Sequence, residues 1–380
     1  NDFLYFIDNT IQLFESIGEG EVGSTDSDWF ELYALPNMEL GNVECNINIT
    51  TSDTENPYEI NIPIQIRVSL DQKGFPINGI VIKSSPIIVD LYGNNFQNII
   101  FGSDDNNVYG YMIDGIEMFG FPYSTGDDVR SSPAVADLDK NNSLELIIGS
   151  HDGGLDILSG FGQQLATYQV NGSINGSPAA VDLDQDGDLE VVFTSYNGNS
   201  GDVHAIHHNG TTFYSFPVNL NEKMVGGAAA GDLDGDGYPE LVVCTDNDNI
   251  YAINKDGSIM PGFPFTSTDR FFNAPTLVDL DEDSDLEIVV GNRRGTLHVL
   301  HHDGTEMASY DVGDDIRGGI SVADLNDDGS YELLFTGYDD MIHVWNPIDG
   351  EELEGWPVDM ESNSLTEPVT ADLDNDGDLE

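Results

Sequence analysis

Acidic side chains at alternate positions recur in six short segments of the sequence. In each segment, aspartate stands at position 1, Asp or Asn at positions 3 and 5, a small or flexible residue at position 6 and glutamate at position 9. Oxygen donors in this pattern are the ligands that Ca²⁺ prefers, whereas Mg²⁺ keeps more of its waters. The sequence therefore predicts about six calcium sites, with position 7 supplying a backbone carbonyl. The predicted ligands are Asp137, Asp139, Asn141 and Glu145; Asp182, Asp184, Asp186, Asp188 and Glu190; Asp232, Asp234, Asp236, Tyr238 and Glu240; Asp279, Asp281, Asp283, Asp285 and Glu287; Asp324, Asn326, Asp328, Ser330 and Glu332; and Asp372, Asp374, Asp376, Asp378 and Glu380.

Segment 90–98 departs from this pattern. It reads Asp90, Tyr92, Asn94 and Asn98 at the ligand positions, so we expect it to have lost its metal. In two other segments Asn142 or Ser284 replaces the glycine of position 6, which predicts weaker sites. An EF-hand is excluded, because its bidentate glutamate stands at position 12 between helices, whereas here it stands at position 9 between strand-like runs.

The acidic segments mark an internal repeat. Their first aspartates follow one another at intervals of 45 to 50 residues, at Asp90, Asp137, Asp182, Asp232, Asp279, Asp324 and Asp372. A run of small residues precedes each segment and a β-branched run follows it. Two alternating segments come next, joined by dipeptides such as Asn209-Gly210 and Asp256-Gly257 that favour a two-residue hairpin turn. Four short strands in ~47 residues predict one blade of a β-propeller.

The predicted fold class is therefore all-β. Residues 72–380 are expected to form a β-propeller of seven four-stranded blades, with the small-residue strands innermost and the last blade truncated. The segment 74–77 is expected to supply an outer strand that closes the ring. Residues 1–71 lack the repeat, and their alternating runs 45–50 and 60–68 predict a partial Ig-like β-sandwich. Since the chain begins without Met and ends inside a repeat, we expect it to be a fragment.

The units SSPAVADLDKNNSLELIIGS and SPAAVDLDQDGDLEVVF resemble the FG-GAP/VCBS-type repeats of the integrin α-chain N-terminal propeller and of many secreted bacterial proteins. The resemblance covers residues 72–380 and implies a calcium-binding propeller. An Ig-like segment before such a propeller is similar to the non-catalytic regions of large secreted bacterial peptidases. Because one fold carries many functions, the resemblance implies no activity.

The overall charge restricts the partners and the location. The 380 residues contain 70 Asp and Glu against 11 Lys and Arg, a formal net charge of −59. Nucleic acids and anionic membrane surfaces need a basic footprint and are therefore excluded. Membrane insertion is not expected, because no apolar run reaches the ~18–20 residues of a spanning helix. Calcium sites of this number stabilise a protein where Ca²⁺ is millimolar, so we expect an extracellular, secreted or cell-surface location.

The few basic residues share a narrow register. Five of them stand seven or nine residues before the first aspartate of an acidic segment: Lys83, Arg130, Lys223, Arg270 and Arg317. We expect a ring of cations at the end of the channel opposite the acidic segments, where carboxylate or sulfate groups would bind. The alternative is that each cation pairs with local acids such as Asp128 and Asp315.

No catalytic motif of a hydrolase, phosphate-binding loop or zinc peptidase is present. The sequence therefore predicts a non-catalytic, calcium-stabilised binding or adhesion module whose partner is an extracellular protein or an acidic glycan. The alternatives are a passive spacer beside the catalytic domain of a secreted peptidase, and a propeller-type polysaccharide lyase. The pairs His207-His208 and His301-His302 are expected to be exposed hairpin residues. The repeated Phe-Pro and Trp-Pro pairs are expected to pack at outer strands.

Overall fold

The computed structural model describes residues 4–6, 32–34, 41–50, 59–68, 74–372 and 379. The chain divides into two compact units, Asn1–Pro76 and Ile77–Glu380. The first unit contains two antiparallel strand pairs in its described part, β1 (Leu4–Phe6) with β2 (Leu32–Ala34) and β3 (Gly41–Thr50) with β4 (Glu59–Val68). An Ig-like sandwich over residues 1–71 stays a prediction, because most of these residues lie outside the described ranges.

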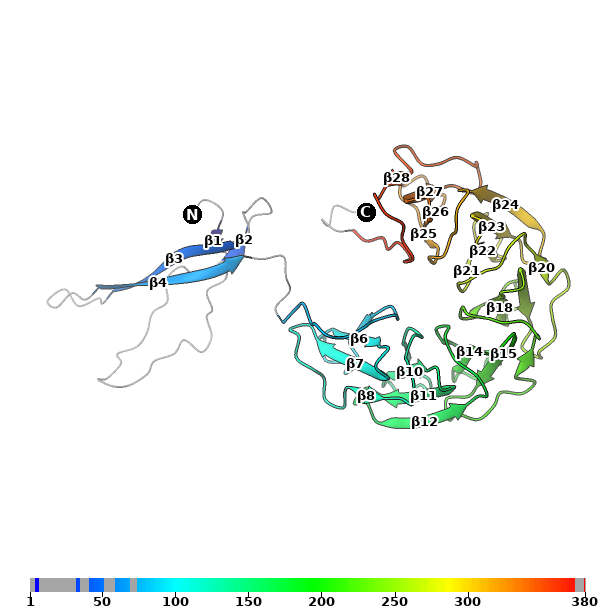
Figure 1. The fold of residues 1–380 in the computed structure, drawn as a ribbon, viewed down its shortest axis with the longest axis horizontal. Helices are drawn as coiled ribbons and strands as arrows, with labels where there is room; N and C mark the ends of the chain where they lie inside the picture. The colour runs from blue at the N-terminus through cyan, green and yellow to red at the C-terminus, as the bar shows by residue number, and fades with distance from the viewer. Residues whose placement is uncertain are drawn as a thin grey trace. The chain divides into compact units, whose positions relative to one another are not determined.

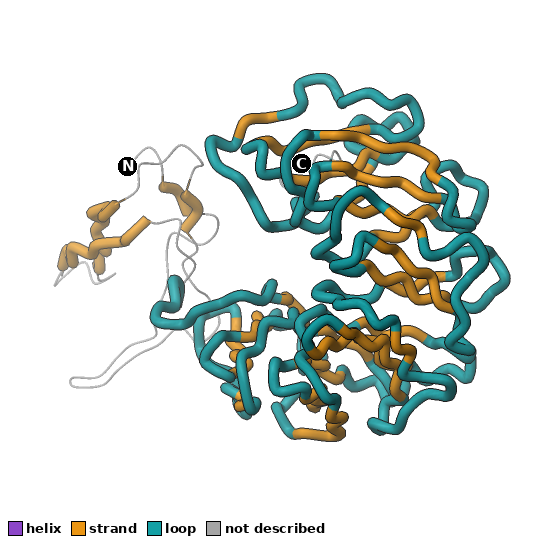
Figure 2. Tube along the Cα trace, turned by 45° about the vertical axis from the view of Figure 1, so that its right-hand side comes forward, coloured by secondary structure: helices purple, strands orange, loops and turns teal. Residues whose placement is uncertain are grey.

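The described part of the second unit forms six four-stranded antiparallel sheets, which follow one another around a common axis (Figure 1). We number these sheets as blades 1 to 6. Their strands are β5 (Ile87–Val89), β6 (Asn98–Gly102), β7 (Asn107–Met112) and β8 (Tyr123–Ser124); β9 (Ala134–Ala136), β10 (Glu145–Gly149), β11 (Gly154–Ser159) and β12 (Gln164–Gln169); β13 (Ala179–Val181), β14 (Glu190–Asn197), β15 (Ser200–Ile206) and β16 (Val218–Asn219); β17 (Ala229–Gly231), β18 (Glu240–Cys244), β19 (Asn249–Ile253) and β20 (Phe265–Thr266); β21 (Thr276–Val278), β22 (Glu287–Gly291), β23 (Thr296–Leu300) and β24 (Glu306–Asp311); and β25 (Ser321–Ala323), β26 (Glu332–Thr336), β27 (Met341–Trp345) and β28 (Val358–Asp359). Figure 2 shows that the described chain consists of strands and loops. No helix long and apolar enough to cross a membrane occurs among these residues.

The first strand of each blade lies nearest the axis, as the small-residue runs predict. The first strands of successive blades contact one another, β9 with β13, β13 with β17 and β17 with β21. The strands β12 and β24 lie on the outer rim (Figure 1). The chain just before these strands is equally close-packed. A Cβ atom on Gly176 would lie 2.3 Å from the backbone nitrogen of Gly227 in the next blade. Small residues are therefore required where the blades converge.

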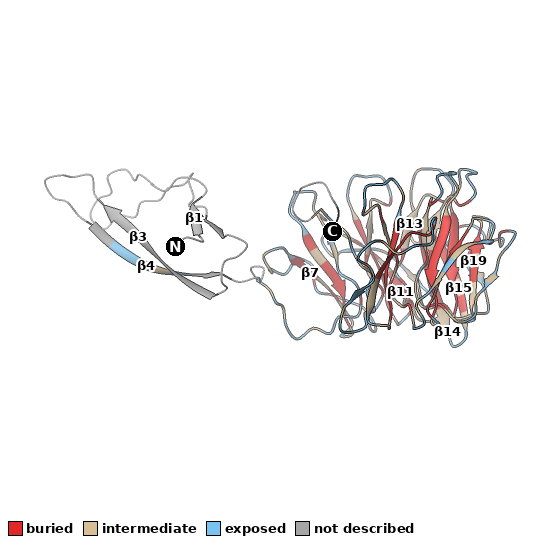
Figure 3. Cartoon of the chain, turned by 90° about the horizontal axis from the view of Figure 1, so that it is seen from above, coloured by how far each residue is buried: buried red, intermediate tan, exposed pale blue. Residues whose placement is uncertain are grey.

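The hydrophobic core lies between neighbouring blades. In β14, Val191 and Phe193 pack with blade 2, whereas the intervening Val192 packs with blade 4. Because successive side chains of a strand point to opposite faces, both faces of a middle blade must be apolar. The β-branched runs of the sequence thus become the buried second and third strands of the blades (Figure 3).

The predicted seventh blade lies mainly outside the described residues. Its first acidic residue, Asp372, is described, but Asp374, Asp376, Asp378 and Glu380 are not. Residues 74–77 form a turn followed by irregular chain, so the outer strand expected there is not formed. The Phe75-Pro76 bond is nevertheless cis, like the four equivalent bonds that precede outer strands in blades 1, 3, 4 and 6. At two of those bonds the ring is buried, at Phe121 and Phe216, which confirms their predicted role in outer-strand packing.

The hairpins that join the third and fourth strands are longer than the sequence predicts. In blade 4 the Asn254 amide donates to the Ser258 carbonyl at 2.9 Å, which encloses a three-residue loop. Within this loop Gly257 has a positive φ of 80°, whereas Asp256 does not. The expected two-residue turn is therefore wrong, and the glycine alone adopts the left-handed conformation.

Burial of a histidine in blade 3 predicts acid sensitivity. The ring of His204 is 5 % exposed and stacks on Phe193, its Nε2 lies 2.9 Å from the Ser195 hydroxyl, and its Nδ1 has no hydrogen-bond partner. Burial lowers the pKa of His204 to about 4. The unfolded chain takes up a proton near pH 6.5 and the folded chain only near pH 4, so this contribution to stability is lost as pH falls between these values.

We therefore expect His204→Phe to flatten the pH dependence of unfolding. Between pH 7 and pH 5 the wild type should lose about 2 kcal/mol more than the variant. Urea unfolding at the two pH values measures this difference. Equal losses in the two proteins would show that His204 is not the responsible group.

Candidate metal centre

The acidic loops join the first and second strands of each blade. In blades 2 to 6 the aspartate of position 1 directly follows the first strand, and the glutamate of position 9 is the first residue of the second strand. In blade 4, for example, Gly231 pairs with Glu240, so Asp232 and Glu240 stand side by side at the end of the sheet. The antiparallel register therefore brings the two ends of each ligand segment together.

Within each loop, backbone amides hold the aspartates inward. In blade 4 the Gly237 amide donates to Asp232 Oδ2 at 2.9 Å, and the Tyr238 amide donates to Asp236 Oδ1 at 2.8 Å. Position 6 needs a positive φ, which is 94° at Gly237, 66° at Asn142 and 81° at Ser284. Asparagine tolerates this conformation better than serine does, so Ser284 is the more strained of the two replacements.

The glutamate of position 9 is buried in every described loop that carries it. Its Oε2 accepts the amide of position 2 at 2.8–3.0 Å in all five blades. Burial raises the pKa of each of these carboxyls, and that of Glu240 to about 7. A buried carboxylate is stable only when a cation or sufficient hydrogen bonds compensate its charge. These five glutamates are Glu145, Glu190, Glu240, Glu287 and Glu332.

The carboxylates of positions 1, 3 and 9 converge in blades 2, 3 and 4, where their candidate ligand oxygens lie within 4.8 Å of one another. In blade 5 the same holds for positions 1, 3 and 5, Asp279, Asp281 and Asp283. In addition, the buried Oδ1 atoms of Asp182, Asp232 and Asp279 have no hydrogen-bond partner. Unpaired buried oxygens beside converging like charges fit a bound divalent cation, and a donor set of oxygen atoms favours Ca²⁺.

Blade 6 retains the loop conformation with fewer carboxylates. The Gly329 amide donates to Asp324 Oδ2 at 2.9 Å, and Asn326 Nδ2 donates to Asp328 at 3.0 Å. The Ser330 amide donates to Asp328 Oδ1, and Glu332 accepts from Asn346 Nδ2 at 3.2 Å. The structure thus brings the predicted residues of this loop together.

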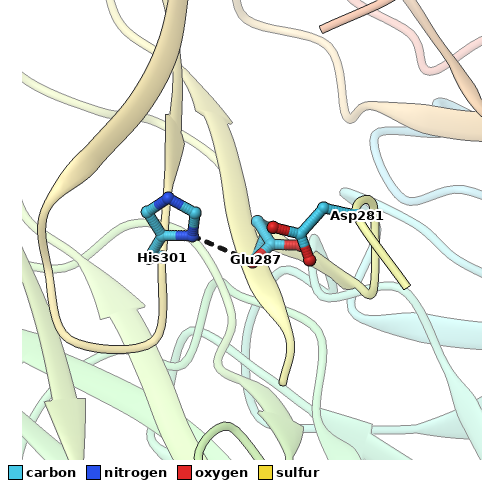
Figure 4. Close-up of side chains that lie close together, drawn as sticks. All are labelled: Asp281, Glu287 and His301. Carbon is cyan, nitrogen blue, oxygen red and sulfur yellow. Dashed lines mark hydrogen bonds and ion pairs between the residues drawn. The ribbon is translucent and has the colours of Figure 1, made fainter. Parts of the chain in front are cut away.

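Histidines support two of the loops, an arrangement that the ligand spacing did not predict. His207 Nδ1 lies 2.9 Å from Glu190 Oε1, and His301 Nδ1 lies 3.3 Å from Glu287 Oε1. Figure 4 shows the Glu287 carboxylate between His301 and Asp281. These histidines lie at the expected hairpin positions but are only partly exposed, since 32 % of the His207 side chain and 34 % of the His301 side chain is accessible. Both pairs occupy the same register of their repeats, which indicates a shared position but does not identify the acidic partner of each ring.

The second histidine of each pair contacts position 7. His208 Nδ1 lies 3.5 Å from an oxygen of Asp188, and His302 Nδ1 lies 2.9 Å from an oxygen of Asp285. These two aspartate side chains therefore face the hairpin, and their backbone carbonyls remain the predicted ligand atoms.

Loop 90–98 keeps the fold of the other loops without their charge. Asn98 begins β6 and is 1 % exposed, and its Oδ1 accepts the Leu91 amide at 3.1 Å, as a glutamate oxygen does in the other blades. Asp90 accepts the amides of Asn94 and Asn95. An amide thus replaces the buried carboxylate while the backbone hydrogen bond is preserved.

The basic residues of the predicted ring contact acids and aromatic rings. Arg130 pairs with Asp104 and Asp128, Lys223 pairs with Asp246, and Arg317 pairs with Asp315. Arg317 also lies over the rings of Phe272 and Tyr338, at 4.8 and 4.7 Å from their centroids, and Arg270 lies over Phe272 at 5.4 Å. The fifth predicted cation, Lys83, is exposed. A ligand of these cations would have to compete with the neighbouring carboxylates.

Comparison with known proteins supports the repeat and the fold. A family model for FG-GAP-like repeats matches residues 182–243 and 232–290. No curated protein matches the sequence. Among solved structures, the Vibrio cholerae biofilm matrix protein Bap1 is similar at 21 % identity and a TM-score of 0.50, over 66 % of this chain and 43 % of Bap1. The chain thus spans less than half of that protein.

Two further structures have a similar fold at lower identity. BBS1N, solved in complex with ARL6DN, is 12 % identical with a TM-score of 0.52, over 77 % of this chain and 88 % of that one. The WD40 β-propeller domain of Doa1 is 14 % identical with a TM-score of 0.51, over 78 % and 88 % of the two chains. At these identities the likeness concerns the fold alone.

Proposed function

Since the chain is a β-propeller that carries FG-GAP-like repeats, we propose that it is a non-catalytic, calcium-stabilised binding or adhesion module of a secreted or cell-surface protein. The observation that carries this proposal is the repeated convergence of carboxylates at positions 1, 3 and 9, together with buried aspartate oxygens that have no partner. A single acidic turn could arise by chance, but the same arrangement recurs at the same place in successive blades. Ca²⁺ would hold the ends of each loop together and compensate the buried glutamate.

The proposed location follows from calcium availability and from charge. Loops of this type are saturated where Ca²⁺ is millimolar, as it is outside cells, and the net charge of −59 keeps the protein soluble there. Bap1, a biofilm matrix protein of similar fold, supports an extracellular role. We propose an extracellular protein or a glycan as the partner. An acidic glycan would bind by displacing carboxylates such as Asp128 and Asp315 from the cations.

Calcium titration of the metal-free protein, followed by a retention assay, tests this function. Isothermal titration should detect Ca²⁺ binding that equimolar Mg²⁺ does not reproduce, because Mg²⁺ demands a smaller octahedral site. The calcium-loaded protein should then be retained on surfaces coated with matrix proteins or polysaccharides and be released by EGTA. Absence of calcium binding contradicts the proposal. Calcium binding without retention on any surface favours a passive spacer, and depolymerisation of an acidic polysaccharide favours a lyase.

A further inference from the structure

A pocket lies between blades 1 and 2, beside the loop that lacks the metal ligands. It has a volume of about 220 Å³ and is lined by segments of loop 90–98, of the acidic loop of blade 2 and of the β11–β12 hairpin. Two aromatic rings form one wall. Tyr92 and Phe161 stack with their ring centroids 4.9 Å apart and their planes inclined by 24°. Phe161 is 61 % exposed, so its ring forms an open face.

Both aromatic residues stand where the other blades carry polar residues. Tyr92 occupies position 3 of its loop, which is Asp or Asn in blades 2 to 6. Phe161 lies at the tip of its hairpin, where blades 3, 4 and 5 have Asn209, Asp256 and Asp303. Two independent replacements, in loops 69 residues apart, thus meet in one stack. The repeat does not require this stack, because the loops of blades 2 to 6 and the hairpin tips of blades 3, 4 and 5 carry polar residues at these positions.

The backbone around the pocket fixes the two rings. A Cβ atom on Gly160 would lie 3.0 Å from the Leu91 carbonyl oxygen, and one on Gly120 would lie 1.9 Å from that of Phe161. The glycines therefore let the hairpin of blade 2 dock directly on two segments of blade 1. Because Asn98 replaces the buried glutamate, loop 90–98 reaches this conformation without a compensating cation. The aromatic face is thus organised before any ligand binds.

The remaining walls supply polar groups for orientation but no positive charge. The pocket is lined by Asp90, Asn142, Ser143 and Ser159, and no lysine or arginine stands among its described lining residues. Lys140 belongs to the acidic loop of blade 2, but its Nζ lies beside Gly187 in blade 3 and not in the pocket lining. An anionic ligand would meet the Asp90 carboxylate with no lysine or arginine in the described pocket lining to compensate its charge, so the site disfavours it. An apolar ligand would leave these polar groups unpaired.

We propose that this pocket binds one ring of a neutral glycan. A hexose ring presents an apolar face of C–H groups, which packs on an aromatic ring, and hydroxyl groups, which bind carboxylates, amides and serines at its edge. The volume lies below the ~300–1,000 Å³ typical of pockets for drug-sized ligands and suits a single ring. Phe119, which is 80 % exposed, directly precedes Gly120, the residue that abuts the Phe161 carbonyl. The inference rests on the proposed binding role but on no metal in loop 90–98.

The test is Phe161→Ala, with Tyr214→Ala as its matched control. Tyr214 is an exposed aromatic residue, as Phe161 is, and 80 % of its surface is accessible. It stands in blade 3 at the register of Phe119 and is not among the residues that line the pocket. The probes are neutral oligosaccharides of glucose, mannose and galactose, with heparin and alginate as anionic comparators, all in millimolar Ca²⁺. We expect at least one neutral oligosaccharide to bind. Phe161→Ala should weaken that binding at least tenfold, and Tyr214→Ala less than twofold.

The calcium-dependent unfolding temperature of each protein is measured alongside binding. Phe161 is exposed, so its removal should leave this temperature unchanged, and Tyr92→Ala gives a second variant of the same stack. The inference is overturned if no neutral oligosaccharide binds a wild-type protein that calcium stabilises, or if Phe161→Ala and Tyr214→Ala weaken binding equally. The neutral-glycan assignment is also overturned if only heparin or alginate binds, or if a protein binds and Phe161→Ala abolishes that binding. Either result leaves the proposed binding role intact.

Discussion

Chelation of calcium with EGTA should lower the unfolding temperature of the propeller more than any single substitution does. Each saturated site contributes about 2.7 kcal/mol when the free calcium concentration is about 100 times Kd. Several such sites together would exceed the net stability of a typical domain, about 5–15 kcal/mol. Without calcium, the converging carboxylates in the loops of blades 2 to 5 repel one another, and the buried oxygens of Asp182, Asp232 and Asp279 stay unpaired. Thermal unfolding followed by circular dichroism over a range of free Ca²⁺ concentrations measures the effect.

Two controls separate specific binding from screening of the net charge of −59. Sodium chloride at high concentration screens repulsion between exposed charges but does not replace a ligated ion. Magnesium has the same charge as calcium but a smaller preferred site. If EGTA leaves the unfolding temperature unchanged, or if sodium chloride restores it fully, the loops do not act as calcium sites.

Substitution Glu240→Gln should have opposite effects with and without calcium. A glutamine oxygen can still accept the Leu233 amide, which Glu240 accepts at 3.0 Å, just as Asn98 accepts the Leu91 amide in blade 1. In EGTA the variant should be at least as stable as the wild type, because burial already disfavours the Glu240 carboxylate and raises its pKa to about 7. In saturating calcium it should lose the contribution of one site, about 2.7 kcal/mol at 100 times Kd.

The control for this variant is Glu354→Gln, which changes an exposed glutamate outside the acidic loops. It should change the unfolding free energy by less than about 0.5 kcal/mol in either condition. Urea unfolding of the three proteins in calcium and in EGTA gives the comparison. An equal loss of stability for Glu240→Gln in both conditions would mean that the carboxylate is structural and binds no calcium.

The sequence alone determined the all-β class, the repeat and the residues of the acidic loops. These features depend on local rules: alternation marks strands, positive-φ residues mark turns, and position 9 follows position 1 within one short loop. The antiparallel register then brings Asp232 and Glu240 together with no help from distant residues. Because each blade repeats the same local solution, the period of the sequence was enough to predict the architecture.

Only the tertiary structure decided which side chains meet across hairpins and between blades. His207 reaches Glu190 because two neighbouring strands of one blade end together, and Tyr92 stacks on Phe161 because two blades dock through glycines. Arg130 reaches Asp104 across 26 residues in the same way. Such contacts depend on the angle and spacing between sheets, which are set by the core that neighbouring blades share. No short-range pattern encodes that packing, so these contacts could not be derived from the spacing of residues in the sequence.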